Sequence, residues 1–123
     1  MIDKLKDLVN ANAAIVRRGR WTNAVMLLGI GETNWIVEIR AGEIAAITPE
    51  DLTVTRHDFA IRGTAEAWAK FWSPMPPPMH HDLSALVRAG KVRMDGDTDM
   101  LMANFLYVKL LLEQLRGHYA EAA

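Results

Sequence analysis

The sequence PPPMHHD places two adjacent histidines, His80 and His81, beside an aspartate. Histidine and aspartate side chains can ligate metals and transfer protons. Neighbouring residues on a helix point about 100° apart, so this pair is poorly arranged to hold one ion. A third ligand would have to come from elsewhere, for instance His57 or Asp58. We therefore expect no metal site, and we expect the two histidines to be solvated or to cap a helix.

The aspartate-rich sequence DGDTD, which begins at Asp95, suggests a calcium loop. An EF-hand loop needs glycine at its sixth position and glutamate at its twelfth. Met100 and Leu106 occupy those positions, so the aspartates are better explained as helix caps. The sequence GIG at Gly29 lacks the third glycine of a dinucleotide-binding turn. We therefore expect no bound cofactor.

Nucleophilic catalysis has little support in the sequence. Ser73 and Ser84 both lie outside a G-x-S-x-G turn. His57 and Asp58 would serve a serine only if the fold brought them to it. We predict that the chain is not an enzyme, and a small hydrolase or metal enzyme that depends on His81 stays as a third hypothesis.

Composition narrows the class of protein. The chain has 123 residues, 50% of them hydrophobic, with a formal net charge of −1 and no cysteine. This is the length of one ordinary domain, which we assign to residues 1–123. Basic and acidic residues are mixed, whereas a nucleic-acid-binding protein usually has a basic face. No apolar run approaches the ~18 residues of a membrane span. We expect a cytoplasmic protein that binds no nucleic acid and spans no membrane.

Hydrophobic periodicity and turn residues predict the secondary structure of the first half. Apolar residues recur at helical spacing over residues 2–18, and Gly19 ends that helix. Three antiparallel strands follow, joined by the turn GIGETN and by a tight hairpin at Ala41 and Gly42. Two further strands come later in the chain. We place the five strands near residues 21–29, 34–40, 43–48, 52–61 and 91–96.

Three more helices are predicted in the second half. Thr64 caps a helix that ends at the prolines of SPMPPP, because proline lacks the backbone donor. A helix over residues 79–89 follows, and the last helix runs from Asp97 or Thr98 to Arg116. This order predicts an α+β fold: a five-stranded, mostly antiparallel, curved sheet covered by helices, with an N-terminal helix and a long apolar C-terminal helix.

The last predicted helix carries more apolar surface than one stripe needs. Leu101, Phe105, Val108, Leu112 and Leu115 form the stripe, and Met102, Leu106, Leu110 and Leu111 widen it. A helix that is apolar nearly all round must be covered on two sides. The second cover could be a partner chain, an apolar ligand or ordinary core. Several methionines beside apolar runs suit irregular or changing contents, although methionine also fills ordinary cores.

Two long segments, together spanning most of residues 20 to 116, resemble the sterol carrier protein 2 family. They are WIVEIRAGEIAAITPEDLTVTRHDFAIRGTAEAWAKFW and LVRAGKVRMDGDTDMLMANFLYVKLLLEQL, and their order and spacing carry the likeness to small bacterial-type members. The resemblance implies a five-stranded sheet capped by helices around an apolar tunnel that binds sterols, fatty acids, phospholipids or acyl-CoA. It implies structural roles for Gly90, Asp95, Gly96 and Asp97, and no catalytic residues. The link SPMPPPMHH is longer and richer in proline than is usual in the family.

From these observations we predict an apolar ligand, such as a lipid, sterol-like molecule or acyl chain, held between sheet and helices. The alternative is a protein-interaction module, either a homodimer or an accessory partner of a larger enzyme such as an α/β hydrolase. For the first reading, the side chains expected to line or gate the pocket are Trp68, Phe71, Trp72, Met75, Met79, Leu83, Met102, Phe105, Leu106 and Val108. The proline-rich segment would then be a rigid lip of that pocket.

Overall fold

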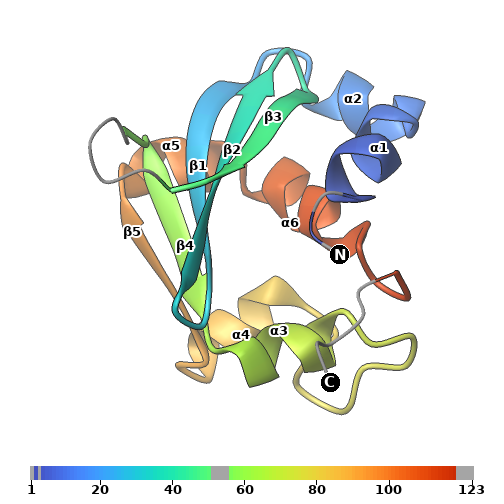
Figure 1. Ribbon diagram of the computed structural model, residues 1–123, viewed down its shortest axis with the longest axis vertical. Coiled ribbons are helices and arrows are strands. Elements are labelled where there is room, and N and C mark those ends of the chain that lie inside the picture. The colour runs from blue at the N-terminus through green and yellow to red at the C-terminus, as the bar shows by residue number, and fades with distance from the viewer. Residues whose placement is uncertain (1, 3, 51–55, 119–123) are drawn as a thin grey trace.

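The computed structural model describes Ile2 and residues 4–50 and 56–118. These residues form a five-stranded sheet, with α1, α2, α3 and α6 lying to one side of it (Figure 1). The strands are β1 (Asn23–Ile30), β2 (Thr33–Arg40), β3 (Glu43–Pro49), β4 (Phe59–Gly63) and β5 (Val92–Gly96). The helices are α1 (Lys4–Asn10), α2 (Ala13–Arg18), α3 (Ala65–Phe71), α4 (Leu83–Arg88), α5 (Thr98–Ala103) and α6 (Phe105–Glu113).

The strand order is β3-β2-β1-β4-β5, and it confirms the predicted α+β class. β1 pairs with β2, β2 with β3 and β4 with β5, all antiparallel. β1 and β4 are parallel, which makes the sheet mixed. Local turn residues predict hairpins, but they carry no information about where β4 joins the sheet after leaving β3. The mostly antiparallel sheet is therefore confirmed, with one parallel pair at its centre.

The core lies on the face of the sheet that the helices cover. Met26 of β1 is directly opposite Val37 of β2 and Phe59 of β4, and all three side chains are fully buried. Side chains alternate between the two faces of a strand, so Leu28 and Ile61 extend the same apolar face two residues further. This shared register is what brings strands distant in sequence onto one core.

The β2–β3 hairpin is fastened to the helices at its tip. Ala41 and Gly42 have φ angles of 52° and 83°, the left-handed turn predicted for this pair. The Tyr107 hydroxyl of α6 donates a hydrogen bond of 2.7 Å to the carbonyl oxygen of Gly42. A Cβ atom at Gly42 would meet the carbonyl oxygen of Val16 and lie 2.8 Å from the carbonyl carbon of Gly19. The backbone of the turn thus packs directly on the end of α2.

We expect Tyr107 to make the protein less stable in alkali. Burial, with a smaller contribution from the charge of Glu43, raises the pKa of the Tyr107 hydroxyl above its usual range. Above about pH 10 the unfolded phenol loses its proton while the folded one keeps it. The unfolded state then binds fewer protons, so the free energy of unfolding falls as pH rises, by up to about 1.4 kcal/mol per pH unit.

Urea unfolding of the wild type and Tyr107→Phe at pH 7 to 11 measures this effect. The variant loses the bond to Gly42, so at pH 7 it should be less stable by about 1–3 kcal/mol. The difference in the free energy of unfolding between the two proteins should narrow above pH 10, because only the wild type has a buried phenol that loses its proton when the protein unfolds. A gap that stays constant over this range would contradict the expectation.

The predicted N-terminal helix over residues 2–18 is wrong in one respect, because it is two helices. α1 ends at Asn10, and Asn12 caps α2 by accepting a hydrogen bond of 3.3 Å from the amide of Ile15. An asparagine side chain competes with helical hydrogen bonds and favours such a cap. The predicted end is confirmed, since Arg17 and Arg18 lie in the last turn before Gly19.

The single long C-terminal helix is also corrected. The chain forms α5 and α6, which meet at Asn104, where the φ angle is −115°. The Asn104 amide donates to the carbonyl oxygen of Met100 at 2.9 Å, and its oxygen accepts from the Thr22 hydroxyl at 2.8 Å. Asp97 is the N-cap of α5, one of the two residues predicted for that role. α6 itself ends at Glu113, before the predicted Arg116.

Two further boundaries differ from the prediction. The helix predicted from residue 79 begins only at Leu83, with Asp82 as its N-cap, because Met79 has a φ angle of 72° that no α-helix accommodates. β4 begins at Phe59, later than predicted, and the part of that predicted strand over residues 52–55 lies outside the described residues. The predicted cap at Thr64 is confirmed by its 3.0 Å bond from the amide of Ala67.

Candidate functional site

Three aromatic side chains of α3 and its C-terminus form one buried cluster. The rings of Trp68 and Trp72 stack with centroids 4.9 Å apart, and Phe71 meets Trp68 edge-on at 5.7 Å. The Trp68 indole N–H donates to the carbonyl oxygen of Gly29 at 2.8 Å, and that of Trp72 donates to Leu112 at 2.7 Å. These bonds satisfy the polar atoms of both indoles and join α3 to β1 and α6. The cluster is therefore part of the packed core.

The structure divides the predicted pocket residues into three groups by burial. Leu83 and Val108 are fully buried, as are the three aromatic residues of the cluster. Phe105 is half-buried against the core. The other four are exposed and lie on two different segments: Met75, Met79, Met102 and Leu106. Their contact with a ligand stays a prediction.

The additional apolar residues of the last two helices also include both buried and exposed side chains. Leu111 is fully buried and Leu110 is half-buried against the core. Met102 at the end of α5 and Leu106 at the start of α6 lie on either side of the break at Asn104 and remain 54% and 49% exposed. Ordinary core thus covers one side of this helical segment, and the other side faces outward within the described residues.

Arg116 braces the proline-rich segment at both ends. Its Nε donates to the carbonyl oxygen of Phe71 at 2.9 Å, and its Nη2 donates to that of His81 at 2.8 Å. The guanidinium also lies 5.0 Å from the centre of the Phe71 ring. Between these anchors Met75 is 88% exposed, whereas His80 is buried. Arg116 thus joins the two ends of the segment, and the role of the segment as a rigid lip of an apolar pocket stays a prediction.

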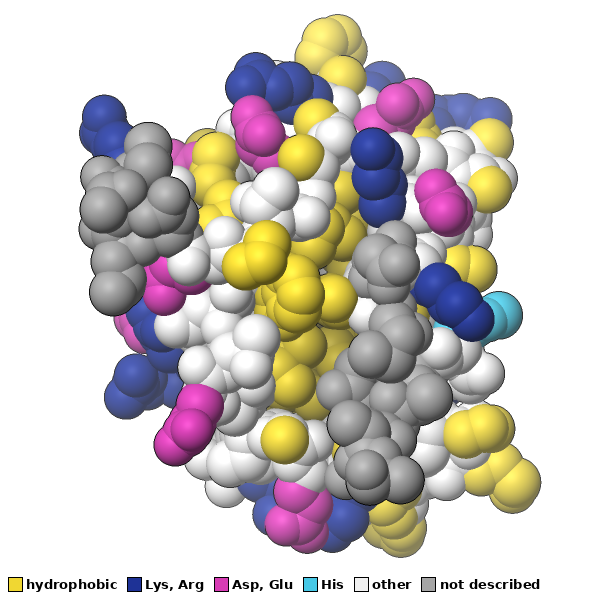
Figure 2. All heavy atoms as spheres, in the orientation of Figure 1, with side chains coloured by type: hydrophobic (Ala, Val, Ile, Leu, Met, Phe, Trp, Pro, Cys, Tyr) yellow, Lys and Arg dark blue, Asp and Glu magenta, His cyan; other side chains and the backbone are white. Residues whose placement is uncertain are grey.

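A hydrophobic hollow opens on the side of the molecule shown in Figure 2. Hydrophobic atoms lie at its base, in the middle of this face. Trp35 of β2 and Ile47 of β3 point to the core side of the sheet, and both remain only half-buried while packing against the core. We call this feature the apolar hollow, and we infer that Trp35 and Ile47 line it, because both are apolar, lie on the core side of the sheet and are only half-buried. Neither residue was among those that the sequence predicted to line the pocket. The alternation of side chains along β2 and β3 could have identified both, because it places them on the core side of the sheet.

The aspartates have structural roles among the described residues. The prediction that both histidines are solvated or cap a helix is wrong for His80, which is buried, whereas His81 is exposed. Asp97 caps α5, and Asp82 caps α4 while pairing with Lys109 at 3.1 Å. The backbone amide of Ser84 and the Lys109 ammonium, outweighing the effect of burial, hold the pKa of the Asp82 carboxyl below its usual value. No group of three histidine or acidic side chains gathers to hold a metal in the described ranges. No helix there is long and apolar enough to cross a bilayer.

The arrangement of these elements recurs in solved structures. A conserved hypothetical protein of Thermus thermophilus, described as possibly a sterol carrier protein, superposes with a TM-score of 0.72 at 10% identity, over 97% of this chain and 86% of that one. A crystal structure of sterol carrier protein 2 superposes with a TM-score of 0.70 at 16% identity, over 93% and 92% of the two chains. The fold is that of sterol carrier protein 2.

The sterol carrier protein 2 fold also occurs inside a larger protein. The sec-alkylsulfatase of Pseudomonas sp. matches with a TM-score of 0.54 at 15% identity, over 75% of this chain and only 14% of that enzyme. No protein-family model matches the sequence, and no curated protein matches it significantly. The likeness is therefore one of architecture, and the expected arrangement of sheet and helices, drawn from the sequence, is confirmed at this level.

Proposed function

We propose that the domain binds an apolar ligand, such as a lipid, a sterol-like molecule or a fatty acyl chain, without transforming it. The apolar hollow carries this proposal. Trp35 and Ile47 leave part of their surface unburied on the core side of the sheet, where a folded protein would ordinarily complete its packing. The sterol carrier protein 2 neighbours support the same class of ligand.

Burial of ligand surface would drive binding. Each methylene group removed from water contributes about 0.8 kcal/mol before the cost of ordering the chain. Five or six buried methylenes would therefore give about 4–5 kcal/mol, which limits the affinity to about millimolar before that cost is subtracted, so a tighter complex needs a longer buried chain. The hollow needs no charged partner for such a ligand, because acyl and sterol bodies carry no charge.

Native mass spectrometry of the purified protein, followed by solvent extraction, tests the proposal directly. We expect an added mass that extraction identifies as a lipid, or saturable binding of a fluorescent acyl probe to the extracted protein. If no ligand co-purifies and no acyl probe binds, the proposal is wrong. Light scattering of the same sample shows whether any assembly accompanies binding.

Trp35→Glu should lower the affinity for the acyl probe by at least about tenfold. A carboxylate in the apolar hollow would have to lose its hydration when the acyl chain binds. Ile36→Glu is the matched control, because Ile36 is half-buried on the same strand and points to the opposite face. Fluorescence titration measures both, with circular dichroism to check the fold. A folded Trp35→Glu variant that binds as tightly as the wild type would exclude the hollow as the site.

A second role, protein interaction, has one specific observation in its favour. Met102 and Leu106 expose large apolar side chains on neighbouring turns of α5 and α6. Exposed apolar residues are common singly, whereas a contiguous apolar patch marks an interaction site, and this role requires that the two residues contribute to such a patch. In this reading the sec-alkylsulfatase neighbour supports an association with a larger enzyme. A concentration-dependent dimer in light scattering, without any bound lipid, would favour this role over ligand binding.

A further inference from the structure

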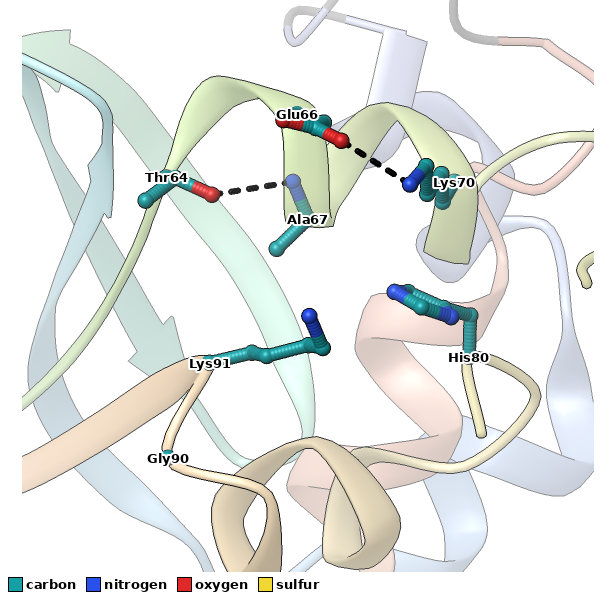
Figure 3. Close-up of a pocket in the computed structure, with 7 residues that line it drawn as sticks. All are labelled: Thr64, Glu66, Ala67, Lys70, His80, Gly90 and Lys91. Carbon is teal, nitrogen blue, oxygen red and sulfur yellow. Dashed lines mark hydrogen bonds and ion pairs between the residues drawn. The ribbon is translucent and has the colours of Figure 1, made fainter. Parts of the chain in front are cut away.

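A polar pocket of about 300 Å³ lies between the start of α3 and the loop that leads into β5. Figure 3 shows side chains from three segments turned toward it. α3 directs Trp68 and Phe71 into the core and presents Glu66 and Lys70 to this pocket. The residues that line this pocket are thus different from those assigned to the apolar hollow.

Lys91 gives the pocket a net positive charge, because Glu66 is the one carboxylate beside two lysines among the residues that line it. Lys70 pairs with Glu66 at 2.9 Å, and this bond holds the pKa of the Glu66 carboxyl below its usual value. The pair is therefore ionised and largely neutral as a unit. Lys91 extends into the pocket (Figure 3) and forms no ion pair within residues 4–50 and 56–118. Its ammonium remains available to an anion.

His80 adds a second nitrogen to the pocket. The proline-rich segment and the left-handed backbone at Met79 bury the His80 side chain to 7% exposure. Its Nδ1 lies 3.0 Å from the carbonyl oxygen of Pro78, so Nδ1 carries the proton that this oxygen accepts. The other ring nitrogen, Nε2, points toward the middle of the pocket (Figure 3).

A second depression continues the positive surface. It is more open, about 540 Å³, and shares Thr64, Gly90 and Lys91 with the first pocket. Arg62 and Arg93 lie opposite each other on β4 and β5 and line it. Both guanidiniums share one carboxylate, Asp95, at 3.4 and 3.6 Å. Two cations on one anion leave a positive excess beside Lys91.

We propose that Lys91 and His80 form a binding site for a phosphate-class oxyanion. The Lys91 ammonium contributes a charge-assisted hydrogen bond, and Nε2 of His80 contributes a second. Because the Nδ1 proton is committed to Pro78, Nε2 can donate only when the imidazole carries both protons. Binding of the anion therefore takes up a proton. The phosphate belongs to a free compound or to the headgroup of a lipid.

Amide NMR titration with inorganic phosphate, at constant ionic strength against sodium chloride, tests the site. We expect saturable shifts at Gly90, Lys91 and Ala67, and at least about tenfold weaker binding in Lys91→Ala. Lys91 is exposed, so this variant should fold normally. Lys4→Ala is the charge-matched control, since Lys4 is an exposed lysine on α1, outside the pocket. The proposal is overturned if shifts do not saturate, or if Lys4→Ala weakens binding as much as Lys91→Ala.

Sulfate distinguishes a hydrogen bond from His80 from simple attraction to the positive charge of the pocket. Its own charge does not change near neutral pH, so any pH dependence of its binding comes from the protein. Wild-type protein should bind sulfate more tightly at pH 6 than at pH 8, and His80→Asn should bind it weakly and equally at both. The other titratable groups facing the pocket are Glu66, Lys70 and Lys91. A pH dependence that persists in His80→Asn would remove the histidine from the site.

Two ligands distinguish the sources of the phosphate. Glycerol phosphate carries the group alone, and a short-chain monoacyl glycerol phosphate adds an acyl tail. Equal affinities assign the site to free phosphate compounds, whereas a tighter acyl form that Trp35→Glu weakens assigns it to a lipid headgroup. Failure of the acyl probe to bind would defeat the proposed lipid function and leave the phosphate result intact.

Discussion

Trp72→Ala should lower the free energy of unfolding by about 3–5 kcal/mol, the usual loss when a large buried aromatic is truncated in a core. Trp72 is fully buried and stacked on Trp68. Its indole also donates to the carbonyl oxygen of Leu112, so the variant removes that bond and leaves the oxygen with the 3.5 Å hydrogen bond from the amide of Leu115. Urea unfolding followed by far-ultraviolet circular dichroism measures the loss without depending on tryptophan fluorescence.

Two control variants distinguish the loss of buried packing from the mere removal of a tryptophan. Trp72→Phe keeps most of the ring and loses the hydrogen bond, so we expect a smaller loss, about 1–2 kcal/mol. Trp21→Ala removes a tryptophan that is 83% exposed and should change stability by no more than about 0.5 kcal/mol. If Trp72→Ala instead cost under about 1 kcal/mol and abolished acyl binding, Trp72 would line a ligand cavity, as the sequence alone suggested.

Gly42→Ala should destabilise the protein by about 2–5 kcal/mol. Its φ of 83° costs a residue with a side chain about 1–2 kcal/mol. The new Cβ would also overlap the backbone of Val16 and Gly19, which cannot swing aside as a side chain can. Overpacking of this kind adds about 1–3 kcal/mol. Thermal and urea unfolding would show the loss.

Gly90→Ala is the matched comparison for this steric effect. Gly90 has a similar φ of 73°, but a Cβ built there has nothing within 4 Å. Its substitution should therefore cost only the backbone term, about 1–2 kcal/mol. Equal losses in the two variants would mean that the hairpin tip does not press on the end of α2.

Sequence patterns predicted the strands well, because side-chain alternation and turn chemistry are local. The hairpin at Ala41 and Gly42 and the cap at Thr64 follow from the residues at those positions. The helix breaks at Asn12 and Asn104 were missed, since apolar periodicity continues through both. Asn12 is a cap signal that can be read from sequence, but Asn104 depends on Thr22, a partner distant in the chain.

The sequence by itself determined the class of fold and the apolar character of the protein, because both depend on the order and periodicity of side chains along the chain. Only the tertiary structure decided which apolar side chains are fully buried in the core and which remain partly exposed. Trp68 and Trp72 are locked by bonds to Gly29 and Leu112, whereas Trp35 stays half-buried. It also brought Lys91 and His80 to one pocket. Such juxtapositions depend on strand pairing and helix packing, which no local pattern encodes.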